Sequence, residues 1–422
     1  MDKKVLKYKD EYLENLFNLL RIDSVLVEQP EIKDAPFGKG CVDALNYVLD
    51  LGAKMGFKTR NVNNVCGHIE FGEGEEILGI LCHLDVVPTG DGWTNPPFDP
   101  VMKDGIIYAR GVNDDKGPLM SALYAMKYLK DSGFVPNKRV RLIVGTDEET
   151  ASRGLKKYLE VCETPNFGFS PDAEFPLIYG EKGILSIDIV SNEKTELKVQ
   201  SGDRYNVVPE KCLGTFHGKT YETVGKRAHA MEPRNGDNAL LKFANLYSDM
   251  FNNNLLKFCS KYLNDSRLND LGLNYTHPEM GDLTCNVAIC DIKDGEGKIG
   301  LNLRYPIEWD KENFYKVLKE KANEYGLKVN VLVDSIPHYV NPKGDMIEKL
   351  HRAYIEVTKD DKTPLLTIGG GTYARMLKNA VAFGAGLPGR EEVAHNVDEY
   401  MSLEDLFTAL KIYIRAIELL TK

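Results

Sequence analysis

One run of apolar residues, EILGILCHLDVV (76–87), constrains the possible folds of this chain more than any other segment. A long apolar run without polar alternation predicts a strand buried on both faces, which is typical of parallel or mixed sheets covered by helices. Three further segments predict buried strands: VRLIVGT (140–146), FGFS (167–170) and NAVAFGAG (379–386). An amphipathic helix is predicted from Pro118 to Gly133, between the apolar run at 76–87 and the strand at 140–146. This alternation of strands and helices favours an α/β fold with a mainly parallel central sheet.

The sequence pattern changes over residues 184–337. Three segments there alternate apolar and polar residues, as half-exposed antiparallel strands do: ILSIDIVSNEKTELKVQ (184–200), KIGLNLRYP (298–306) and LKVNVLVDSIP (327–337). Helices are predicted between them, over 237–263 and 310–325. The α/β pattern then returns and ends in a helix at which Ser402 and Asp405 fit a capping box. We therefore expect an α/β domain formed by residues 1–183 and 338–422, interrupted by an inserted α+β lid domain with an antiparallel sheet at 184–337.

Composition excludes several classes of partner. The net charge is −10 and the chain has no basic block, so nucleic acid and anionic membrane surfaces are not expected partners. No stretch approaches the roughly 18 apolar residues that a membrane span needs. The N-terminal residues MDKKVLKYKDEYLENL lack the apolar core of a signal peptide, and the eight cysteines form no CxxC pair. We expect a cytoplasmic protein with reduced thiols.

Histidine and carboxylate side chains gather where the predicted strands end. They are His83 and Asp85 after the first strand, Asp114 and Asp115 before the amphipathic helix, Glu148 and Glu149 after VRLIVGT, Asp172 after FGFS, and His395 before the last helix. Ligands bind at strand ends in open α/β sheets. Two histidines with several carboxylates, and no cysteine among them, suit a pair of divalent ions such as Zn²⁺ or Mn²⁺.

Each of these pairs has a simpler explanation when it is considered alone. His83 could end a strand in solvent, and one residue of the Asp114–Asp115 pair could be the N-cap of the helix. Glu148 and Glu149 could lie in a solvated loop, although consecutive acidic residues repel one another unless a cation or a proton compensates them. Their joint occurrence at the ends of one sheet favours a metal site over the separate explanations.

With these segments, the chain resembles the dinuclear zinc peptidases that include peptidase V, carboxypeptidase G and succinyl-diaminopimelate desuccinylase. The resemblance covers essentially the whole chain and is closest to the peptidase V-type dipeptidases. The matching segments are CHLDVVP (82–88), ARGVNDDKGP (109–118), TDEET (146–150), PDAEFP (171–176), NVVP (206–209), AHAMEPRNGDNA (228–239), NLRYP (302–306), GGGTYAR (369–375) and AHNVDEY (394–400).

The resemblance implies two divalent metal ions per chain. It implies that His83 and Asp172 bind one ion, that Glu149 and His395 bind the other, and that Asp114 bridges both. Zn²⁺ is the expected metal, and Mn²⁺ and Co²⁺ are the alternatives.

Two further carboxylates receive roles from the same resemblance. Glu148 is expected to be the general base that takes a proton from a water between the metals. Asp85 is expected to accept a hydrogen bond from the His83 ring, because residues i and i+2 of an extended chain point to the same side. The peptide bond between Asp114 and Asp115 is expected to be cis.

One position departs from the family pattern. Cys82 stands where the residue before the metal-binding histidine is usually glycine. A buried, inert thiol is the expected explanation, and sensitivity to oxidation is the alternative.

Substrate contacts are implied mainly in the lid. His229 matches the position that stabilises the oxyanion, and Asn206 matches a second lid contact. Arg304 matches the arginine that binds the terminal carboxylate of the substrate. The segment with Gly370, Gly371 and Thr372 lacks the GxxxxGK[ST] pattern of a phosphate loop, so a backbone cradle for that carboxylate is expected instead.

The expected function is hydrolysis of dipeptides with a free N-terminal amine. Asp172 is an aspartate, whereas relatives that act on acylated amino acids usually carry glutamate there. An amidohydrolase acting on N-acyl amino acids is the alternative, and a non-catalytic metal-binding protein is a third hypothesis. The inserted domain is long enough for two four-stranded units side by side, and such a doubled lid predicts a monomer, with a homodimer as the alternative.

Overall fold

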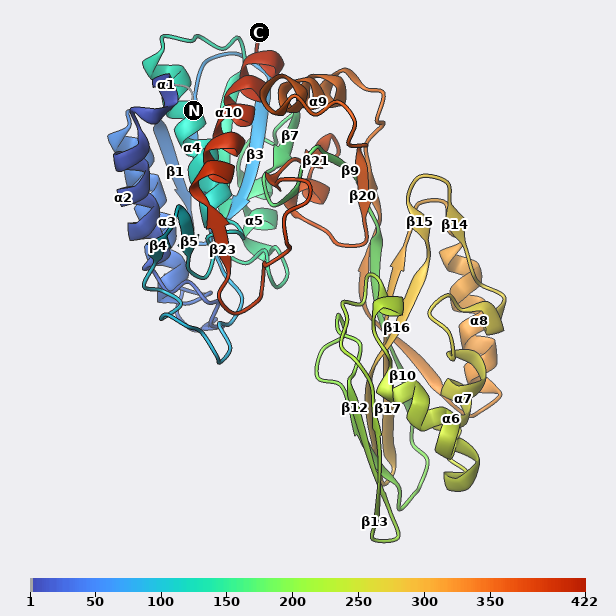
Figure 1. Ribbon diagram of the computed structural model, residues 1–422. Helices are drawn as coiled ribbons and strands as arrows, with labels where there is room; N and C mark the ends of the chain where they lie inside the picture. Colours follow the sequence, from blue (N-terminus) through green and yellow to red (C-terminus); the bar gives the residue numbers. More distant parts are fainter. Residues whose placement is uncertain (1–2) are drawn as a thin grey trace. The chain divides into compact units, whose positions relative to one another are not determined.

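The computed structural model describes residues 3–422, which divide into two compact units (Figure 1). The first unit contains the residues up to Tyr179, then Val340–Leu366 and Thr372–Lys422. The second unit contains Gly180–Tyr339 and the short segment Thr367–Gly371. The chain therefore passes between the units four times.

The first unit is built on a mixed sheet with a parallel centre. Strand β3 (Ile77–His83) lies between β6 (Arg139–Gly145) and β7 (Phe167–Ser170), and β21 (Ala380–Ala382) follows β7, all in parallel. Antiparallel strands continue the sheet at the two edges, with β1 (Lys58–Val62) and β2 (Cys66–Phe71) at one and β9 (Ile178–Glu181) at the other. Strands β19 (His338–Tyr339) and β20 (Leu366–Ile368) pair with β9 where the chain passes from one unit to the other. Every residue of β3 is buried, as the apolar run predicts.

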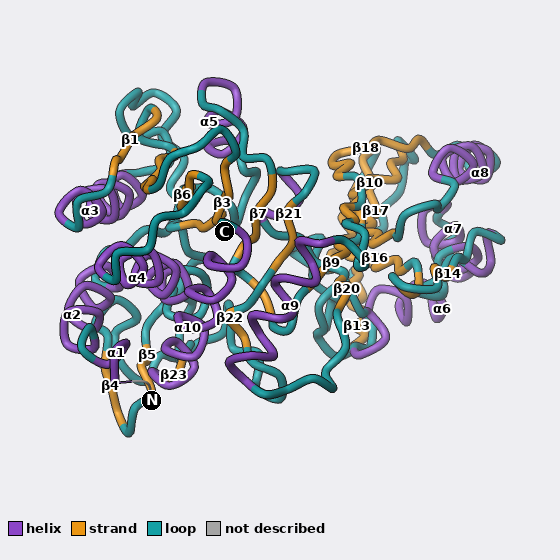
Figure 2. The backbone as a smooth tube through the Cα atoms, turned by 90° about the horizontal axis from the view of Figure 1, so that it is seen from above, coloured by secondary structure: helices purple, strands orange, loops and turns teal. Residues whose placement is uncertain are grey.

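Helices cover both faces of this sheet. Helix α4 (Lys116–Asp131) packs against α10 (Leu403–Leu420) on one face, and α5 (Arg153–Val161) lies on the other (Figure 2). The remaining helices of the unit are α1 (Lys3–Leu6), α2 (Lys9–Leu20), α3 (Lys39–Lys54), α9 (Asp345–Thr358) and the 3₁₀ turn η3 (Tyr373–Met376). Short strands β4 (Val101–Lys103), β5 (Ile106–Tyr108) and β23 (Tyr400–Ser402) form a small separate sheet, and β8 (Ala173–Glu174) pairs with β22 (Ala385–Gly386). The predicted α/β class is confirmed.

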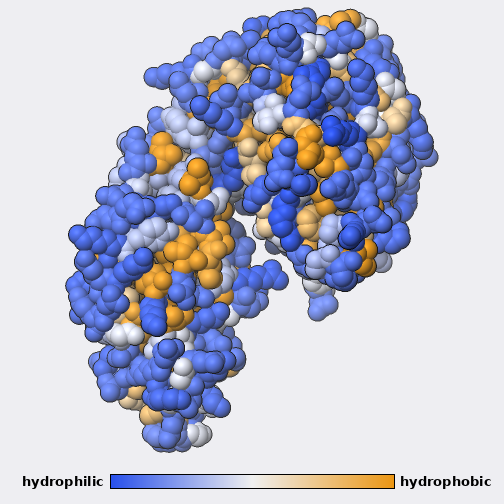
Figure 3. All heavy atoms as spheres, turned by 180° about the vertical axis from the view of Figure 1, so that it is seen from behind, coloured by the Kyte–Doolittle hydropathy of each residue, from blue (hydrophilic) through white to orange (hydrophobic). Residues whose placement is uncertain are grey.

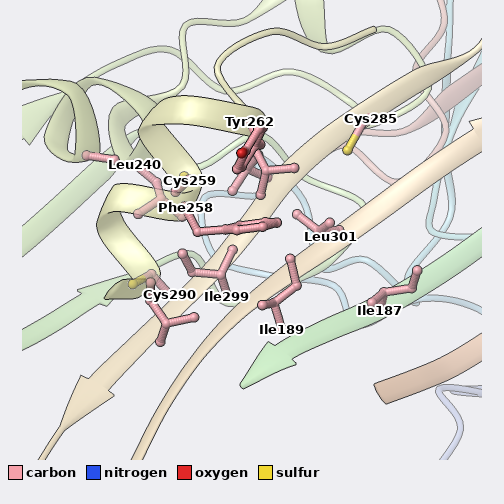
Figure 4. Packing of buried hydrophobic residues seen from close by; sticks show 14 of the residues in the cluster. Ile187, Ile189, Leu240, Phe258, Cys259, Tyr262, Cys285, Cys290, Ile299 and Leu301 are labelled. Atoms are coloured by element: carbon pink, nitrogen blue, oxygen red, sulfur yellow. The ribbon is translucent and has the colours of Figure 1, made fainter. Parts of the chain in front are cut away.

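The second unit is one seven-stranded antiparallel sheet with helices on one face. In spatial order its strands are β13 (Lys219–Val224), β12 (Lys211–Phe216), β11 (Lys198–Ser201), β16 (Thr284–Lys293), β17 (Glu296–Tyr305), β10 (Gly183–Ser191) and β18 (Lys328–Ser335). The helices are α6 (Ala239–Phe251), α7 (Asn254–Tyr262) and α8 (Lys311–Asn323). Phe258 and Tyr262 of α7 pack on Ile299 and Leu301 of β17 in the core between helices and sheet (Figure 4). Two 3₁₀ turns, η1 (Pro233–Asn235) and η2 (Asn269–Leu271), and the hairpin of β14 (Thr276–His277) with β15 (Gly281–Asp282) complete the unit.

The prediction of two four-stranded units side by side is wrong. Strands β10, β16, β17 and β18 with their helices form one βαββαβ unit, and β11, β12 and β13 extend the same sheet beyond β16. Within residues 3–422 the extension brings no helix pair of its own, since α6 packs against β12 and β13 as well as against β16. The extra length of this region therefore widens a single sheet instead of building a second domain.

The opposite edge of this sheet is apolar at its surface. Among residues 3–422, strand β18 pairs only with β10. Four apolar side chains are about half exposed or more, three within the strand and one just after it: Val331, Leu332, Val333 and Ile336. Figure 3 shows apolar atoms gathered on this side of the second unit within an otherwise mainly hydrophilic surface. Within residues 3–422, no helix combines the length and the apolar composition needed to cross a membrane.

The predicted capping box of the last helix is half present. The Ser402 hydroxyl accepts a hydrogen bond from the Asp405 amide at 3.0 Å, as an N-cap does. The Asp405 carboxylate does not complete the box, since it pairs with the Arg390 guanidinium at 2.8 Å.

Removing this cap should destabilise the first unit without changing the histidine and carboxylate side chains at its strand ends. We expect Ser402→Ala to lower the free energy of unfolding by about 1 kcal/mol, because the Asp405 amide loses its acceptor. Urea denaturation followed by circular dichroism measures this change. Ser402→Thr keeps a hydroxyl and serves as the control, so equal losses in the two variants would contradict the capping role.

Candidate metal centre

His83 ends strand β3 with a buried imidazole that is held from one side. Its Nδ1 lies 2.9 Å from the backbone oxygen of Asp85 and 3.6 Å from the Asp85 carboxylate. The nearer acceptor is thus the carbonyl, not the carboxylate that the sequence predicts. A proton on Nδ1 donated to that carbonyl leaves the lone pair of Nε2 directed toward the other acidic residues.

The Asp85 carboxylate instead supports the glutamate pair. Its two oxygens accept the backbone N–H groups of Glu148 and Glu149, each at 3.1 Å. Asp85 is fully buried, so these hydrogen bonds fix the turn after β6 in a low-dielectric setting. The sequence predicts that each of these segments follows a buried strand, but the pairing of one side chain with two amides depends on the folded turn.

The first residue of the acidic run has a structural role. Asp147 is fully buried, and its carboxylate accepts the amides of Arg153 at 2.7 Å and Gly154 at 2.8 Å at the start of α5. The Arg153 side chain also contacts it, at 3.0 Å. This negative charge is therefore compensated within the loop, whereas those of Glu148 and Glu149 are directed elsewhere.

Asp114 lies between two imidazoles. Its Oδ1 is 2.8 Å from His83 Nε2, and its Oδ2 is 2.8 Å from His395 Nε2. Glu149 Oε1 lies 3.0 Å from the same nitrogen of His395. One carboxylate that faces two histidines through its two oxygens has the arrangement that a bridging ligand needs.

The remaining acidic side chains complete two groups of donor atoms. Ligand atoms of His83, Asp114 and Glu149 lie within 4.8 Å of one another, and so do those of His83, Glu148 and Asp172. Asp172 follows β7, and its Oδ2 is 3.6 Å from His83 Nε2. The predicted residues of the first unit are thus brought together at the carboxyl ends of β3, β6 and β7, with His395 reaching them through Asp114 and Glu149.

Two buried atoms in this cluster are poorly satisfied by protein groups alone. His83 Nε2 and Asp114 Oδ1 face each other at 2.8 Å, yet neither makes a hydrogen bond of acceptable geometry within residues 3–422. Buried polar atoms are normally paired, and a cation between a nitrogen and an oxygen lone pair would satisfy both. The donor set of imidazole and carboxylate fits divalent ions.

Asp115 does not act as a conventional N-cap. It occupies the N-cap position of α4, but its side chain makes no capping hydrogen bond. Its Oδ2 accepts the backbone N–H of His83 at 3.1 Å, and the residue is fully buried. The Asp114–Asp115 peptide bond is cis, as the resemblance implies. The two residues therefore have different roles. The Asp114 side chain is directed at the cluster, whereas the Asp115 side chain supports the strand that carries His83.

The thiol before His83 is buried. Cys82 has no exposed surface, and burial together with the nearby Asp115 carboxylate raises the pKa of this thiol well above its usual value. A neutral thiol is a weak nucleophile and a poor metal ligand, which favours the interpretation of Cys82 as inert.

Crowding perturbs the ionisation of the clustered groups. Burial, and then the Asp114 carboxylate, raise the pKa of Asp172 to about 7. Burial and Asp172 raise the pKa of Glu148 well above its usual value. Burial alone would lower the pKa of His395, but hydrogen bonds to Asp114 and Glu149 raise it to about 11. These shifts show that the carboxylates compete for positive charge, which divalent cations would supply.

The predicted lid residues gather on one part of the second unit. The backbone oxygen of Asn206 accepts the Ala230 amide at 2.9 Å beside His229, whose Nδ1 accepts the Met231 amide at 3.1 Å. Arg304 is buried on β17, and it donates to Gly369 O at 2.7 Å.

The glycine-rich segment is divided between the units. Gly370 and Gly371 belong to the second unit, beside Gly369, and Thr372 belongs to the first. The Thr372 hydroxyl accepts the Ala374 amide as the cap of η3. Tyr373, which sequence reasoning passed over, packs its ring 6.2 Å from the His83 ring. A side chain at position 145 would place its Cβ only 2.1 Å from the Tyr373 hydroxyl. Glycine at this position therefore leaves the space that the Tyr373 ring occupies.

Comparison with known proteins gives consistent matches along the chain. The family described as Peptidase family M20/M25/M40 matches residues 79–419. A Staphylococcus epidermidis protein named "Putative dipeptidase" is 38% identical, and the match covers 98% of this chain and 98% of that protein. A Staphylococcus aureus protein, also named "Putative dipeptidase", has the same identity and coverage.

Solved structures share the fold at much lower identity. Human carnosine dipeptidase 1 is 13% identical with a TM-score of 0.68, and the dipeptidase Dug1p of Saccharomyces cerevisiae is 13% identical with a TM-score of 0.67. Each comparison covers 99% of this chain and 97% of the other. An M20 family metallo-carboxypeptidase of Sulfolobus solfataricus is 18% identical with a TM-score of 0.64, covering 97% of this chain and 99% of that chain.

The geometry predicts how metal binding should respond to substitution. We expect two Zn²⁺ ions per chain, with Asp172→Asn and His395→Ala each weakening one of them and Asp114→Asn weakening both. Zn²⁺ titration against a chromophoric chelator measures the stoichiometry. Equal loss of both ions in all three variants would contradict the assignment of separate positions.

Chelation should also lower the thermal midpoint of unfolding, because the carboxylates then repel one another without compensation.

Proposed function

Because this chain belongs to peptidase family M20/M25/M40, we propose that it is a metal-dependent dipeptidase acting on dipeptides with a free N-terminal amine. The observation that carries the metal-dependent part is the Asp114 carboxylate, whose oxygens each lie 2.8 Å from an imidazole of His83 or His395. A Bacillus subtilis protein with the same fold is described as a dinuclear metal-binding peptidase from the M20 family, with 13% identity and a TM-score of 0.55. That description agrees with a two-ion site.

His83, Asp172, Asp114, Glu149 and His395 would hold the two ions. Divalent ions bound there would polarise the scissile carbonyl and lower the pKa of the attacking water. Zn²⁺ is the proposed metal because the donors are imidazole nitrogens and carboxylate oxygens, and Mn²⁺ and Co²⁺ suit the same donors.

Glu148 is proposed as the general base. Its carboxylate lies in the same group of donor atoms as His83 and Asp172, and its backbone is fixed by the Asp85 carboxylate at 3.1 Å. Burial raises the pKa of Glu148, which brings a carboxylate closer to the pKa that suits proton transfer near neutral pH. It would take a proton from water and then donate it to the leaving amine.

Residues of the second unit are proposed to bind the substrate. His229 Nδ1 accepts the Met231 amide, so a neutral ring carries its proton on Nε2, which is a suitable donor to an oxyanion. Arg304 is oriented by Asn302 at 2.9 Å and by Gly369 at 2.7 Å, and a guanidinium fixed in this way suits a terminal carboxylate. Asn206 and the segment with Gly370, Gly371 and Thr372 would add polar contacts.

Two further points support the proposed substrate class. Residue 172 is an aspartate, which the resemblance associates with substrates that have a free amino group, and two Staphylococcus relatives are named putative dipeptidases. The alternative is an amidohydrolase of the same fold that removes acyl groups from N-acyl amino acids.

A matched substrate pair distinguishes the two activities. We expect the Zn²⁺-loaded enzyme to hydrolyse a small panel of free dipeptides and to lose at least about 100-fold in kcat/KM when their amino groups are acetylated, which corresponds to roughly 3 kcal/mol. Product amino acids measured by chromatography report the rates. Faster turnover of the acetylated substrates would reject the dipeptidase in favour of the amidohydrolase.

Proton transfer and metal binding should separate at the glutamate pair. Glu148→Ala is expected to lower kcat by at least the roughly 10²–10⁴-fold typical of general base catalysis, while the Zn²⁺ content stays near that of the wild type. Glu160→Ala, which removes an exposed carboxylate from α5, is the control and should change neither quantity. Loss of both metals in Glu148→Ala would show that the two glutamates have exchanged roles.

A further inference from the structure

Glu399 is a fully buried carboxylate four residues after His395, and the reaction proposed above assigns it no role. We propose that Glu399 is a positioning residue that sets the distance between Asp114 and His395. It would thereby set the geometry of the metal position formed by Asp114, Glu149 and His395. The inference rests on the proposed function in taking these two residues as metal ligands.

The side chain of Glu399 gathers the loop that carries Asp114. Each of its two oxygens accepts two hydrogen bonds, which uses the acceptor capacity of an ionised carboxylate. The donors are the Asn113 amide at 2.7 Å and the Asp114 amide at 3.2 Å on Oε1, and the Gly111 amide at 3.0 Å and Arg110 Nη1 at 2.8 Å on Oε2.

The backbone of Glu399 takes part in the same junction. Its carbonyl oxygen accepts the Ala109 amide at 3.1 Å, immediately before the loop. The side chain of Asn113 donates to the backbone oxygen of Tyr400 at 3.4 Å. One residue therefore joins two segments that lie far apart in the sequence, and each of them carries a proposed metal ligand.

Arg110 supplies the countercharge. It is almost completely buried, its guanidinium lies 5.1 Å from the Trp93 ring centroid, and its Nη2 is 3.4 Å from the backbone oxygens of Pro88 and Thr89. A buried carboxylate without such a partner would be costly. Within residues 3–422 the carboxylate of this pair has its four donors, whereas the Nε of Arg110 makes no hydrogen bond. The pair thus extends the junction to the loop that follows Asp85.

The segment that carries His395 needs external support. His395 and Asp398 both have left-handed backbone angles, with φ of 65° and 55°, which are uncommon for residues other than glycine. The Asp398 carboxylate accepts the amide and the hydroxyl of Thr94, each at 2.8 Å. With Asp398 and Glu399 anchored in succession, the strained turn that presents the His395 imidazole is held at its C-terminal end.

The test compares two buried carboxylate–arginine pairs of the same unit. Glu399→Gln keeps the shape of the side chain but replaces one acceptor oxygen with an NH₂ group, which cannot accept the N–H donors that face it. Glu70→Gln does the same to the Glu70–Arg141 pair, whose atoms lie 2.6 Å apart. Arg141 lies opposite Gly79 in the sheet register, four residues before His83, so it is not at the strand ends that form the metal centre.

We expect the folded Glu399→Gln holoenzyme to lose about 10–100-fold in affinity for one of the two Zn²⁺ ions, as loss of a residue supporting metal ligands typically causes. Its kcat should fall while KM for the dipeptide changes less. Glu70→Gln should lower the thermal midpoint but keep both Zn²⁺ affinities. Zn²⁺ competition titrations, with circular dichroism as the check on folding, measure all of these effects.

Wild-type affinity for both ions in folded Glu399→Gln would overturn the inference alone. An equal loss of affinity in Glu70→Gln would also overturn it, because the effect would then come from general destabilisation. No Zn²⁺ binding by the wild-type chain would overturn the proposed function and this inference with it. If Glu399→Gln does not fold, Arg110→Lys decides: it keeps the charge and the three amide donors, so a smaller loss confined to the same ion supports the inference and unchanged affinity rejects it.

Discussion

Repulsion among buried carboxylates is the constraint on which the rest of the first unit depends. Asp114, Glu149 and Asp172 approach the same two imidazoles, and the pKa of Asp172 rises to about 7 because of burial and the charge of Asp114. The two buried cations of the neighbouring segment are engaged elsewhere, since Arg110 pairs with Glu399 and the Lys116 ammonium donates to the backbone oxygen of Ile22. The parallel sheet supplies rigid strand ends that hold the acidic groups in place despite their repulsion, and divalent ions are the natural compensation.

Around this cluster, support comes from groups that touch no proposed ligand atom. The Asp85 carboxylate fixes the amides of the glutamate pair, the Asp115 carboxylate fixes the amide of His83, and Gly145 leaves space for the Tyr373 ring beside the His83 imidazole. The buried charges of Asp85 and Asp115 are thus partly compensated, because both carboxylates accept backbone amides. Precise placement of ligands in a metal site depends on such outer contacts as much as on the ligands themselves.

The sequence predicts the parts of this structure that depend on local pattern. The apolar run of β3, the strand FGFS of β7 and the amphipathic helix after Asp115 all follow from periodicity and end signals, and the ligand types follow from their place at strand ends. Other features depend on contacts between distant segments. The length of the inserted domain predicts two units, whereas β11–β13 extend the existing sheet, because alternation does not reveal which sheet a strand joins. The i and i+2 spacing predicts a hydrogen bond from His83 to the Asp85 carboxylate, but in the folded chain this carboxylate accepts two amides of the turn after β6. Glu399 is recognisable in the sequence only as an acidic residue four positions after His395. Its four donors lie in the loop at 110–114, and no sequence pattern predicts that this loop contacts residue 399.

The order of the proposed ligands along the chain has a consequence for when the site can form during synthesis. His83, Asp114, Glu149 and Asp172 all precede the second unit, whereas His395 and Glu399 come just before the C-terminal helix α10. Domains form largely as the chain emerges from the ribosome, N-terminal parts first. A nascent chain that has folded as far as Asp172 would therefore present a cation with one imidazole and an acidic cluster, but not with the imidazole of His395. The proposed centre could therefore be completed only after the segment with His395 and Glu399 has left the ribosome and packed beside the ends of β3 and β6, so binding at the position that needs His395 would come after folding of the earlier strands.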